Sequence, residues 1–136
     1  MEKGNLANIA ILFLRVALGV IFLAHGLQKL VGAFGGGGIE GVSRMMQGLH
    51  FAPANFWAWV VALVESVGGL FLILGVLPRL SAALIAVVMV VAIAKVHFAN
   101  GLFAAKGGFE FALLILATCL FFIATGAGKF SLFNRW

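Results

Sequence analysis

The sequence predicts an all-α fold: an integral membrane four-helix transmembrane bundle. Of its 136 residues, 64% are hydrophobic and only 10% are charged, and the mean hydropathy is +1.20. Soluble domains are about half apolar and about a quarter charged, so a soluble core of this size cannot absorb the surplus of apolar side chains. Four apolar runs are each about long enough to cross a bilayer. We therefore expect residues 1–136 to form a single transmembrane domain.

Composition also excludes several functional classes. The net charge is +5, but the cations are spread singly along the chain, so we expect a lipid bilayer as the partner and no nucleic acid. Cys119 is the only cysteine, which rules out an internal disulfide or a redox-active cysteine pair. No nucleophile motif, phosphate loop or carboxylate dyad identifies a catalytic residue.

The four predicted spans cover residues 6–30, 55–77, 80–98 and 109–127. An even number of spans places both termini on one side of the membrane, which we call side A; the opposite side is side B. The cations assigned to side A favour a cytoplasmic location for that side by the positive-inside rule. These side-A cations are Lys3, Arg79, Lys129 and Arg135.

The connection between the first two spans is the only long one. It opens with four glycines, residues 35–38, which are costly to keep helical. Over residues 39–49 apolar side chains then recur at helical spacing opposite polar ones, which predicts a short amphipathic helix lying at the interface or folded back as a lid. In the second span, Gly68 and Gly69 are small enough to let neighbouring helices approach closely. The turn at Pro78 makes the second and third spans antiparallel neighbours.

Arg15 and Glu65 are predicted to form a buried ion pair. At 1.5 Å per residue, Arg15 lies about 13 Å in from side A and Glu65 about 15 Å in from side B. Opposite charges at similar depth in a thin bundle should pair, with a structural role as the simplest interpretation. Alternatively, Glu65 is protonated and neutral.

A second polar group gathers near side B: His25, Lys29, Lys95, His97 and Glu110, all within about two helical turns of one interface. Together they predict a cationic pocket that the amphipathic segment could cover. Each residue has a simpler explanation as well. His25 can hydrogen-bond a neighbouring helix, the two lysines can extend to headgroups, and Glu110 can complement a helix dipole. Lys95 and His97 lie about 200° apart on an ideal helix, so both face the pocket only if the helix unwinds there.

Two ligands of other classes were weighed for this pocket. A haem held by His25 and His97 is conceivable, but two histidines at similar depth are a common coincidence and no further pair exists. A zinc site has less support, because there is no cluster of cysteine or aspartate. We therefore predict no metal site.

Three motifs in order resemble the DoxX family of small four-helix membrane proteins of bacteria and archaea. They are R-x-x-L-G-x-x-F-L-x-H-G-x-x-K at residues 15–29, E-x-x-G-G-x-x-L-x-x-G at 65–75 followed by Pro-Arg, and K-x-H-x-x-N-G followed by G-G-x-E at 95–110. The resemblance spans nearly the whole chain, and the only departure is the glycine-rich start of the first loop. It implies a bacterial or archaeal plasma membrane.

The resemblance also implies a function. The family takes its name from a small subunit of a terminal quinol oxidase, and relatives form a thiosulfate:quinone oxidoreductase. This chain would then be a small membrane subunit of a quinone-linked oxidoreductase, with electrons supplied through a bound cofactor or a partner subunit. A quinone ring suits the apolar bundle, while His25 or His97 and Lys29 hydrogen-bond its oxygens and relay protons. An anionic sulfur oxyacid could occupy the same pocket.

Two functions of other classes remain open. The chain could be a non-enzymatic membrane scaffold or assembly factor that packs partner helices, or another copy of itself, against Gly68 and Gly69. It could also be a small membrane protein that binds an anion or a lipid, although four helices are few for a carrier unless the protein is a homo-oligomer.

Overall fold

The computed structural model describes residues 3–133, and within that range the chain is entirely helix, turn and loop. The predicted all-α class is therefore confirmed. The side-A cation Arg135 and the side chain of Lys3 lie outside the described part of the structure. The main helices are α1 (Lys3–Val31), α2 (Gly38–Gly48), α3 (Ala54–Leu74), α4 (Pro78–Ala92) and α5 (Glu110–Thr125). Four short elements join them: η1 (Ala33–Gly35), η2 (Ile93–His97), η3 (Phe98–Asn100) and η4 (Ala104–Lys106).

Three helical stretches among the described residues are long and apolar enough to cross a membrane: Gly4–Val31, Ala54–Leu74 and Pro78–Asn100. These correspond to the first three predicted spans. The fourth apolar run forms α5, whose 16 residues are fewer than the roughly 20 that an untilted span requires. The membrane class is thus supported, and three of the four predicted spans meet the length criterion.

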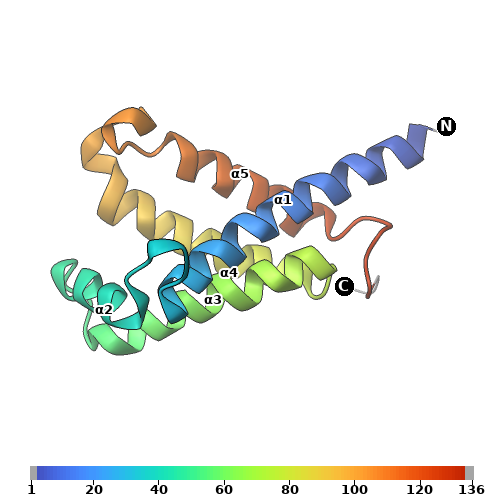
Figure 1. Ribbon diagram of the computed structural model, residues 1–136. Coiled ribbons are helices and arrows are strands. Elements are labelled where there is room, and N and C mark those ends of the chain that lie inside the picture. Colours follow the sequence, from blue (N-terminus) through green and yellow to red (C-terminus); the bar gives the residue numbers. More distant parts are fainter. Residues whose placement is uncertain (1–2, 134–136) are drawn as a thin grey trace.

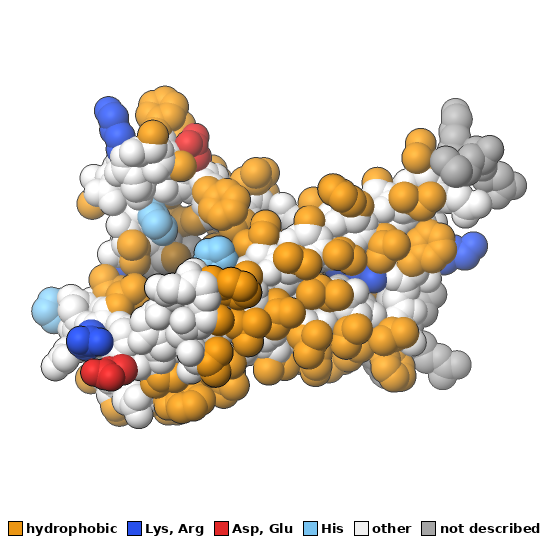
Figure 2. All heavy atoms as spheres, viewed as in Figure 1, with side chains coloured by type: hydrophobic (Ala, Val, Ile, Leu, Met, Phe, Trp, Pro, Cys, Tyr) orange, Lys and Arg blue, Asp and Glu red, His pale blue; other side chains and the backbone are white. Residues whose placement is uncertain are grey.

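The helices are arranged as two pairs. α1 packs along α3, α4 packs along α5, and α3 also contacts α4 (Figure 1). Hydrophobic side chains cover most of the face formed by α1 and α3, as expected for a surface in contact with lipid (Figure 2). One hydrophobic core joins α1, α3, α4 and α5. Its members include Leu18 and Phe22 from α1, Leu72 from α3, Ile85 and Met89 from α4, and Ile115 and Phe122 from α5.

Small residues allow α1 and α3 to approach closely. A Cβ atom added at Gly26 would lie 2.5 Å from Cα of Ser66, and one at Gly69 would lie 2.7 Å from the carbonyl oxygen of Gly19. Only glycine fits such contacts between backbones. Gly68 points elsewhere: a Cβ there would lie 3.3 Å from Cδ1 of Ile85 on α4. The two predicted packing glycines therefore face different helices.

A short turn joins α3 to α4 at Pro78, as the sequence predicted, and Gly75 ends α3. Gly75 has φ +73°, and the following amide of Val76 donates to the carbonyl of Phe71 at 2.9 Å. Pro78 then occupies the first turn of α4, where its missing N–H costs nothing. The short connection makes α3 and α4 antiparallel neighbours.

The predicted amphipathic helix is α2, shifted by one residue at each end from the expected range of 39–49. Val42 and Met46 are buried against Ala58 of α3, whereas Arg44 and Glu40 are exposed and lie 3.7 Å apart. Contacts with both α1 and α3 fold α2 back onto the helical pair. Of the two predicted arrangements, the structure shows the folded-back one.

Candidate functional site

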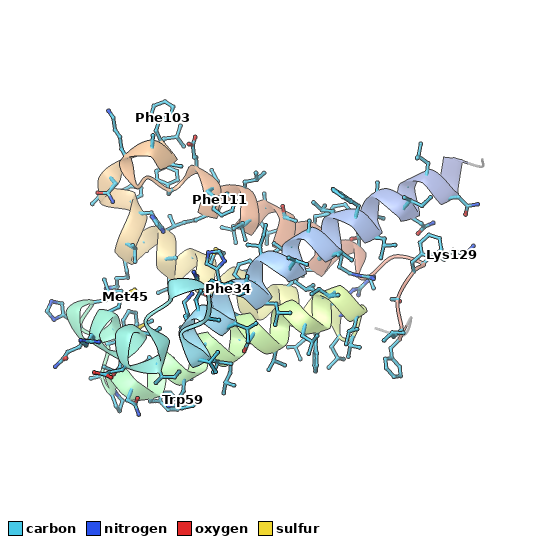
Figure 3. The ribbon with its side chains drawn as sticks, in the orientation of Figure 1. Phe34, Met45, Trp59, Phe103, Phe111 and Lys129 are labelled. Carbon is cyan, nitrogen blue, oxygen red and sulfur yellow. The ribbon has the colours of Figure 1, made fainter. Side chains whose placement is uncertain are left out.

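A cavity of about 400 Å³ lies at the side-B end of the molecule, where α2 and α3 diverge from the turn between α4 and α5. The same end is visibly hollowed in the space-filling view (Figure 2). Met45 of α2 and Phe111 of α5 line it from opposite walls (Figure 3). Its lining is mostly apolar, with four ionisable side chains: His25, Lys29, Glu65 and His97.

An ion pair joins two of these side chains across the α1–α3 contact. Lys29 Nζ donates to Glu65 Oε2 at 2.5 Å, and the exposed fractions of the two side chains are 19% and 5%. The register of the close contact explains the pairing, because Gly26 lies against Ser66 and Lys29 follows one turn later on the same face. A nearly buried carboxylate is thereby given a cationic partner within the cavity wall.

The predicted Arg15–Glu65 pair is therefore wrong. Arg15 is 1% exposed, but its Nη1 donates to the carbonyl of Ala127 at 2.5 Å and its Nη2 to that of Phe130 at 2.6 Å. A Cβ atom added at Gly75 would lie 3.0 Å from Nη1 of Arg15. Gly75 is ten residues, or about 15 Å along the helix axis, from Glu65. Depths counted from the two span ends misled the prediction because α1 is offset along α3: Lys29, in the last turn of α1, lies beside Glu65 in the middle of α3.

His25 lines the cavity from α1. Its Nδ1 donates to the carbonyl of Ile21, one turn earlier on the same helix, at 2.8 Å. A carbonyl oxygen can only accept, so this bond requires the hydrogen on Nδ1. Nε2 is then the nitrogen left for a ligand.

His97 lines the cavity from η2, a π-helical turn that follows α4 directly. Its Nδ1 donates to the carbonyl of Gly107 at 2.9 Å, and Nδ2 of Asn100 donates to the same oxygen at 3.2 Å. The sequence analysis allowed both Lys95 and His97 to face the pocket only if the helix unwinds there. The helix does widen into a π turn, a feature common at functional sites. Lys95 nevertheless is exposed and is absent from the cavity lining.

Glu110 does not reach the cavity either. It is exposed, and its Oε1 accepts the backbone N–H of Ala104 at 2.7 Å. That bond holds the loop between η3 and α5, where the amide of Glu110 also donates to the carbonyl of Leu102 at 2.9 Å. The structure thus brings together three of the five residues predicted for the pocket and gives Glu110 a bracing contact in the loop.

The predicted amphipathic helix contributes to the cavity wall. Met45 and Met46 of α2 and Leu49, directly after it, line the cavity, and Phe51 and Trp57 extend this wall towards α3. Methionine side chains are flexible and polarizable, so this wall can adapt to the outline of a ligand. α2 therefore forms part of the cavity wall as well as packing against α1 and α3.

The sequence analysis missed two parts of the site. Glu65 was assigned to the midplane with Arg15, although the spacing of Gly26 and Lys29 against Ser66 and Glu65 could have indicated its position. The aromatic wall residues Trp57 and Phe111 carried no recognisable signal apart from hydrophobicity.

Comparison with known proteins gives a consistent result. The family model described as DoxX matches residues 10–98. A Bacillus subtilis (strain 168) protein described as "Putative oxidoreductase CatD" is 31% identical over 120 residues, covering 88% of this chain and 81% of that protein. Two Haemophilus influenzae proteins are both described as "Uncharacterized protein". The first is 30% identical over 131 residues, covering 91% of this chain and 88% of that protein. The second is 32% identical over 131 residues, covering 96% of this chain and 85% of that protein. No solved structure matches.

Proposed function

Because the chain belongs to the DoxX family, we propose that it is a small multi-pass membrane subunit of a quinone-linked oxidoreductase. The observation that carries this proposal is the side-B cavity, whose apolar walls contain a buried ion pair and two histidines. The relative described as "Putative oxidoreductase CatD" adds support for redox chemistry.

The cavity suits a lipophilic ring. Its volume of about 400 Å³ falls within the roughly 300–1,000 Å³ of typical small-molecule sites, which combine apolar walls with a few convergent polar groups. Trp57 and Phe111 offer flat faces to such a ring, and the methionines of α2 adapt to it. An isoprenoid tail would leave between the helices towards lipid.

The polar residues of the wall can bind ring oxygens and move protons. A quinone supplies reversible two-electron, two-proton chemistry when it is bound. Lys29 retains two N–H donors beside its bond to Glu65, and these can bind an oxygen atom. His25 and His97 can accept or donate a proton through Nε2, the nitrogen that their backbone contacts leave free.

The membrane arrangement that we propose has four spans, with α5 as the fourth. Its 16 residues are continuous with apolar neighbours, and the segment after it returns to α1, where the amide of Lys129 donates to Oδ1 of Asn8 at 3.1 Å. The described chain therefore begins and ends at the same end of the molecule (Figure 1). Side A would face the cytoplasm of a bacterium or archaeon, with the cavity towards the opposite face of the plasma membrane.

Electron transfer would need a second component. Cys119 is a single buried cysteine, so this chain cannot form an internal redox disulfide. We therefore propose a partner subunit that carries the second redox centre.

The test is to purify the full chain gently, extract it with organic solvent and identify bound molecules by mass spectrometry, with a visible spectrum to detect haem. We expect a quinone in near-stoichiometric amount. Ala112→Phe, which fills the buried cavity wall, should lose it, whereas Ala117→Phe on the exposed face of the same helix should retain it.

Other results would point to other functions. Recovery of phospholipid alone would favour a lipid-binding protein. A protein that retains no quinone, and whose complexes with partner proteins are unaffected by His25→Ala, would be a scaffold. Either result would overturn the proposed quinone site.

A further inference from the structure

The connection between α4 and α5 carries exposed apolar side chains at the side-B end of the molecule. We call residues 98–109 the side-B loop. Phe98 is 67% exposed, Leu102 45% and Phe103 61%. Figure 3 shows Phe103 at the outer tip of this loop, pointing away from the cavity. Exposed apolar clusters of this kind mark a surface that contacts a partner or a membrane.

The backbone of the side-B loop satisfies its own hydrogen bonds. The amides of residues 106–110 all donate to carbonyl oxygens of residues 101–104, at 2.9–3.0 Å. The amide of Ala104 donates to the carboxylate of Glu110 at 2.7 Å. A loop in water can leave its amides to the solvent, whereas non-helical backbone near hydrocarbon has to bond internally. The internal bonds therefore suit the loop to a partly dehydrated position.

The side-B loop also lies at the level of a membrane interface. The apolar stretch Pro78–Asn100, which is long enough to cross a membrane, ends inside this loop. Two further aromatic side chains, Phe56 and Trp59, are exposed in the first turns of α3. Figure 3 shows Trp59 and Phe103 at the same end of the molecule, on opposite sides of it. Aromatic side chains around one end of a bundle are typical of the headgroup level.

Two lysines give this region its charge. Lys95 directly precedes the side-B loop and Lys106 lies within it; both are exposed, and neither ammonium group has an ion-pair or hydrogen-bond partner among the described residues. The carboxylate of Glu110 is held by the amide of Ala104. A lysine can lay its apolar stem along acyl chains and reach a headgroup with its ammonium group. Phenyl rings beside unpaired ammonium groups therefore match an anionic phospholipid.

We infer that the side-B loop is an interfacial anchor, which lies between headgroups and acyl chains and binds anionic phospholipid through Lys95 and Lys106. The anchor does not involve the ligand of the cavity, and it rests only on the four-span arrangement proposed above. A partner protein would also cover the apolar side chains of the loop, but it would not account for aromatic side chains exposed at the same end on α3. The anchor adjoins the site, because Gly108 of the loop lines the cavity.

The first measurement is the depth of Phe103. Phe103→Cys in the full chain is spin-labelled in liposomes of phosphatidylglycerol and phosphatidylcholine. Power-saturation electron paramagnetic resonance then compares collisions with oxygen, which concentrates in hydrocarbon, and with a water-soluble nickel chelate. Labels at Gln47, exposed on α2, and Leu120, exposed on α5, give the water and hydrocarbon references. Cys119 is fully buried, so the wild-type chain is the blank. We expect the Phe103 label to favour oxygen clearly more than the Gln47 label does.

The second measurement is the affinity for lipid headgroups. Native mass spectrometry of the full chain, titrated in detergent with phosphatidylglycerol or phosphatidylcholine, gives the dissociation constant of each lipid. The double variant Lys95→Gln, Lys106→Gln should bind phosphatidylglycerol about fivefold more weakly or worse, with phosphatidylcholine binding unchanged. Arg44→Gln is the matched control, because Arg44 is an exposed cation at the same end that already lies 3.7 Å from Glu40. It should leave both affinities unchanged.

The outcomes separate the anchor from the arrangement on which it rests. A Phe103 label as accessible to nickel as the Gln47 label, with Leu120 in hydrocarbon, would overturn the anchor and leave the loop to a partner protein. Unchanged phosphatidylglycerol affinity in the double variant would overturn the lipid selection. A water-accessible Leu120 label would overturn the four-span arrangement and the anchor with it, whereas quinone retention tests the cavity independently. Circular dichroism checks that each variant is folded, and Leu102→Cys replaces Phe103→Cys if that variant does not fold.

Discussion

Lys29 Nζ lies 2.5 Å from Glu65 Oε2, so the last turn of α1 is bonded to the middle of α3 inside the cavity wall. The pair therefore has two consequences. It holds two helices together at their closest contact, and it places both a carboxylate and an ammonium group within reach of a bound ligand.

Removing one partner of this pair should be more harmful than removing both. Lys29→Met leaves Glu65 buried without a cation, which typically costs about 3–5 kcal/mol of unfolding free energy. The double variant Lys29→Met, Glu65→Leu replaces the pair with apolar side chains and should recover much of that loss. Unfolding in a mixed-detergent titration measures both variants.

The matched control for this prediction is Arg44→Met. Its partner Glu40 is exposed, at 3.7 Å, and exposed pairs contribute little, so no measurable change is expected. A single variant as stable as the wild type would show that the Lys29–Glu65 contact does not stabilise the fold.

The two adjacent glycines of α3 should respond differently to the same substitution. Gly69→Ala forces a Cβ to within 2.7 Å of the Gly19 carbonyl oxygen, so we expect a loss of about 1–3 kcal/mol as α1 and α3 separate. Gly68→Ala meets only the flexible end of Ile85, at 3.3 Å, and should cost much less. Thermal unfolding of the two variants checks that Gly69→Ala loses more stability than Gly68→Ala. The opposite order would show that α1 and α3 are not in close backbone contact.

Arg15 should control the segment that follows α5. Arg15→Met removes two hydrogen bonds from a charged donor to the carbonyls of Ala127 and Phe130. Bonds to charged groups contribute about 1.5–3 kcal/mol each, so trypsin should cleave after Lys129 about tenfold faster or more. Mass spectrometry of the timed digest identifies the product.

Arg79→Met is the control for this digest. Arg79 is an exposed cation whose Nη2 makes one long bond, 3.4 Å, to the carbonyl of Ala124. Cleavage at Lys129 should then keep its wild-type rate, and equal acceleration in both variants would contradict a specific role for Arg15.

Glu110 should stabilise the loop that orients His97. Glu110→Ala removes the acceptor of the Ala104 amide, so hydrogen exchange at that amide should accelerate by about tenfold. Glu110→Gln retains a neutral acceptor and should be intermediate. If exchange at Ala104 is unaffected by either change, the loop is held by its backbone bonds alone.

The sequence predicted the helices better than their register. Hydrophobic length and the turn at Pro78 located the helices to within a few residues, because these signals are local. The partners of Glu65 and Arg15 depend instead on how far one helix slides along another, and that is determined by contacts such as Gly26 against Ser66. Depth counted along separate spans cannot supply this offset.

The same distinction applies to the candidate site. His25, Lys29 and His97 were predicted to lie together because all three come near side B, and the cavity contains them. Lys95 and Glu110 satisfy the same depth criterion but point away, since depth does not specify which side of a helix a residue occupies. The π turn at Ile93–His97 changes the direction in which these side chains point, and none of its residue types predicts a π turn.

Unequal helix lengths have a consequence for the surrounding lipid. At 1.5 Å per residue, the 29 residues of α1 extend about 44 Å and the 16 residues of α5 about 24 Å, whereas the hydrocarbon layer is about 30 Å thick. In the four-span arrangement proposed above, one flat hydrocarbon layer cannot match both helices, so α1 would tilt and the bilayer would thin beside α5. Such a molecule should prefer short-chain bilayers over thick, ordered ones.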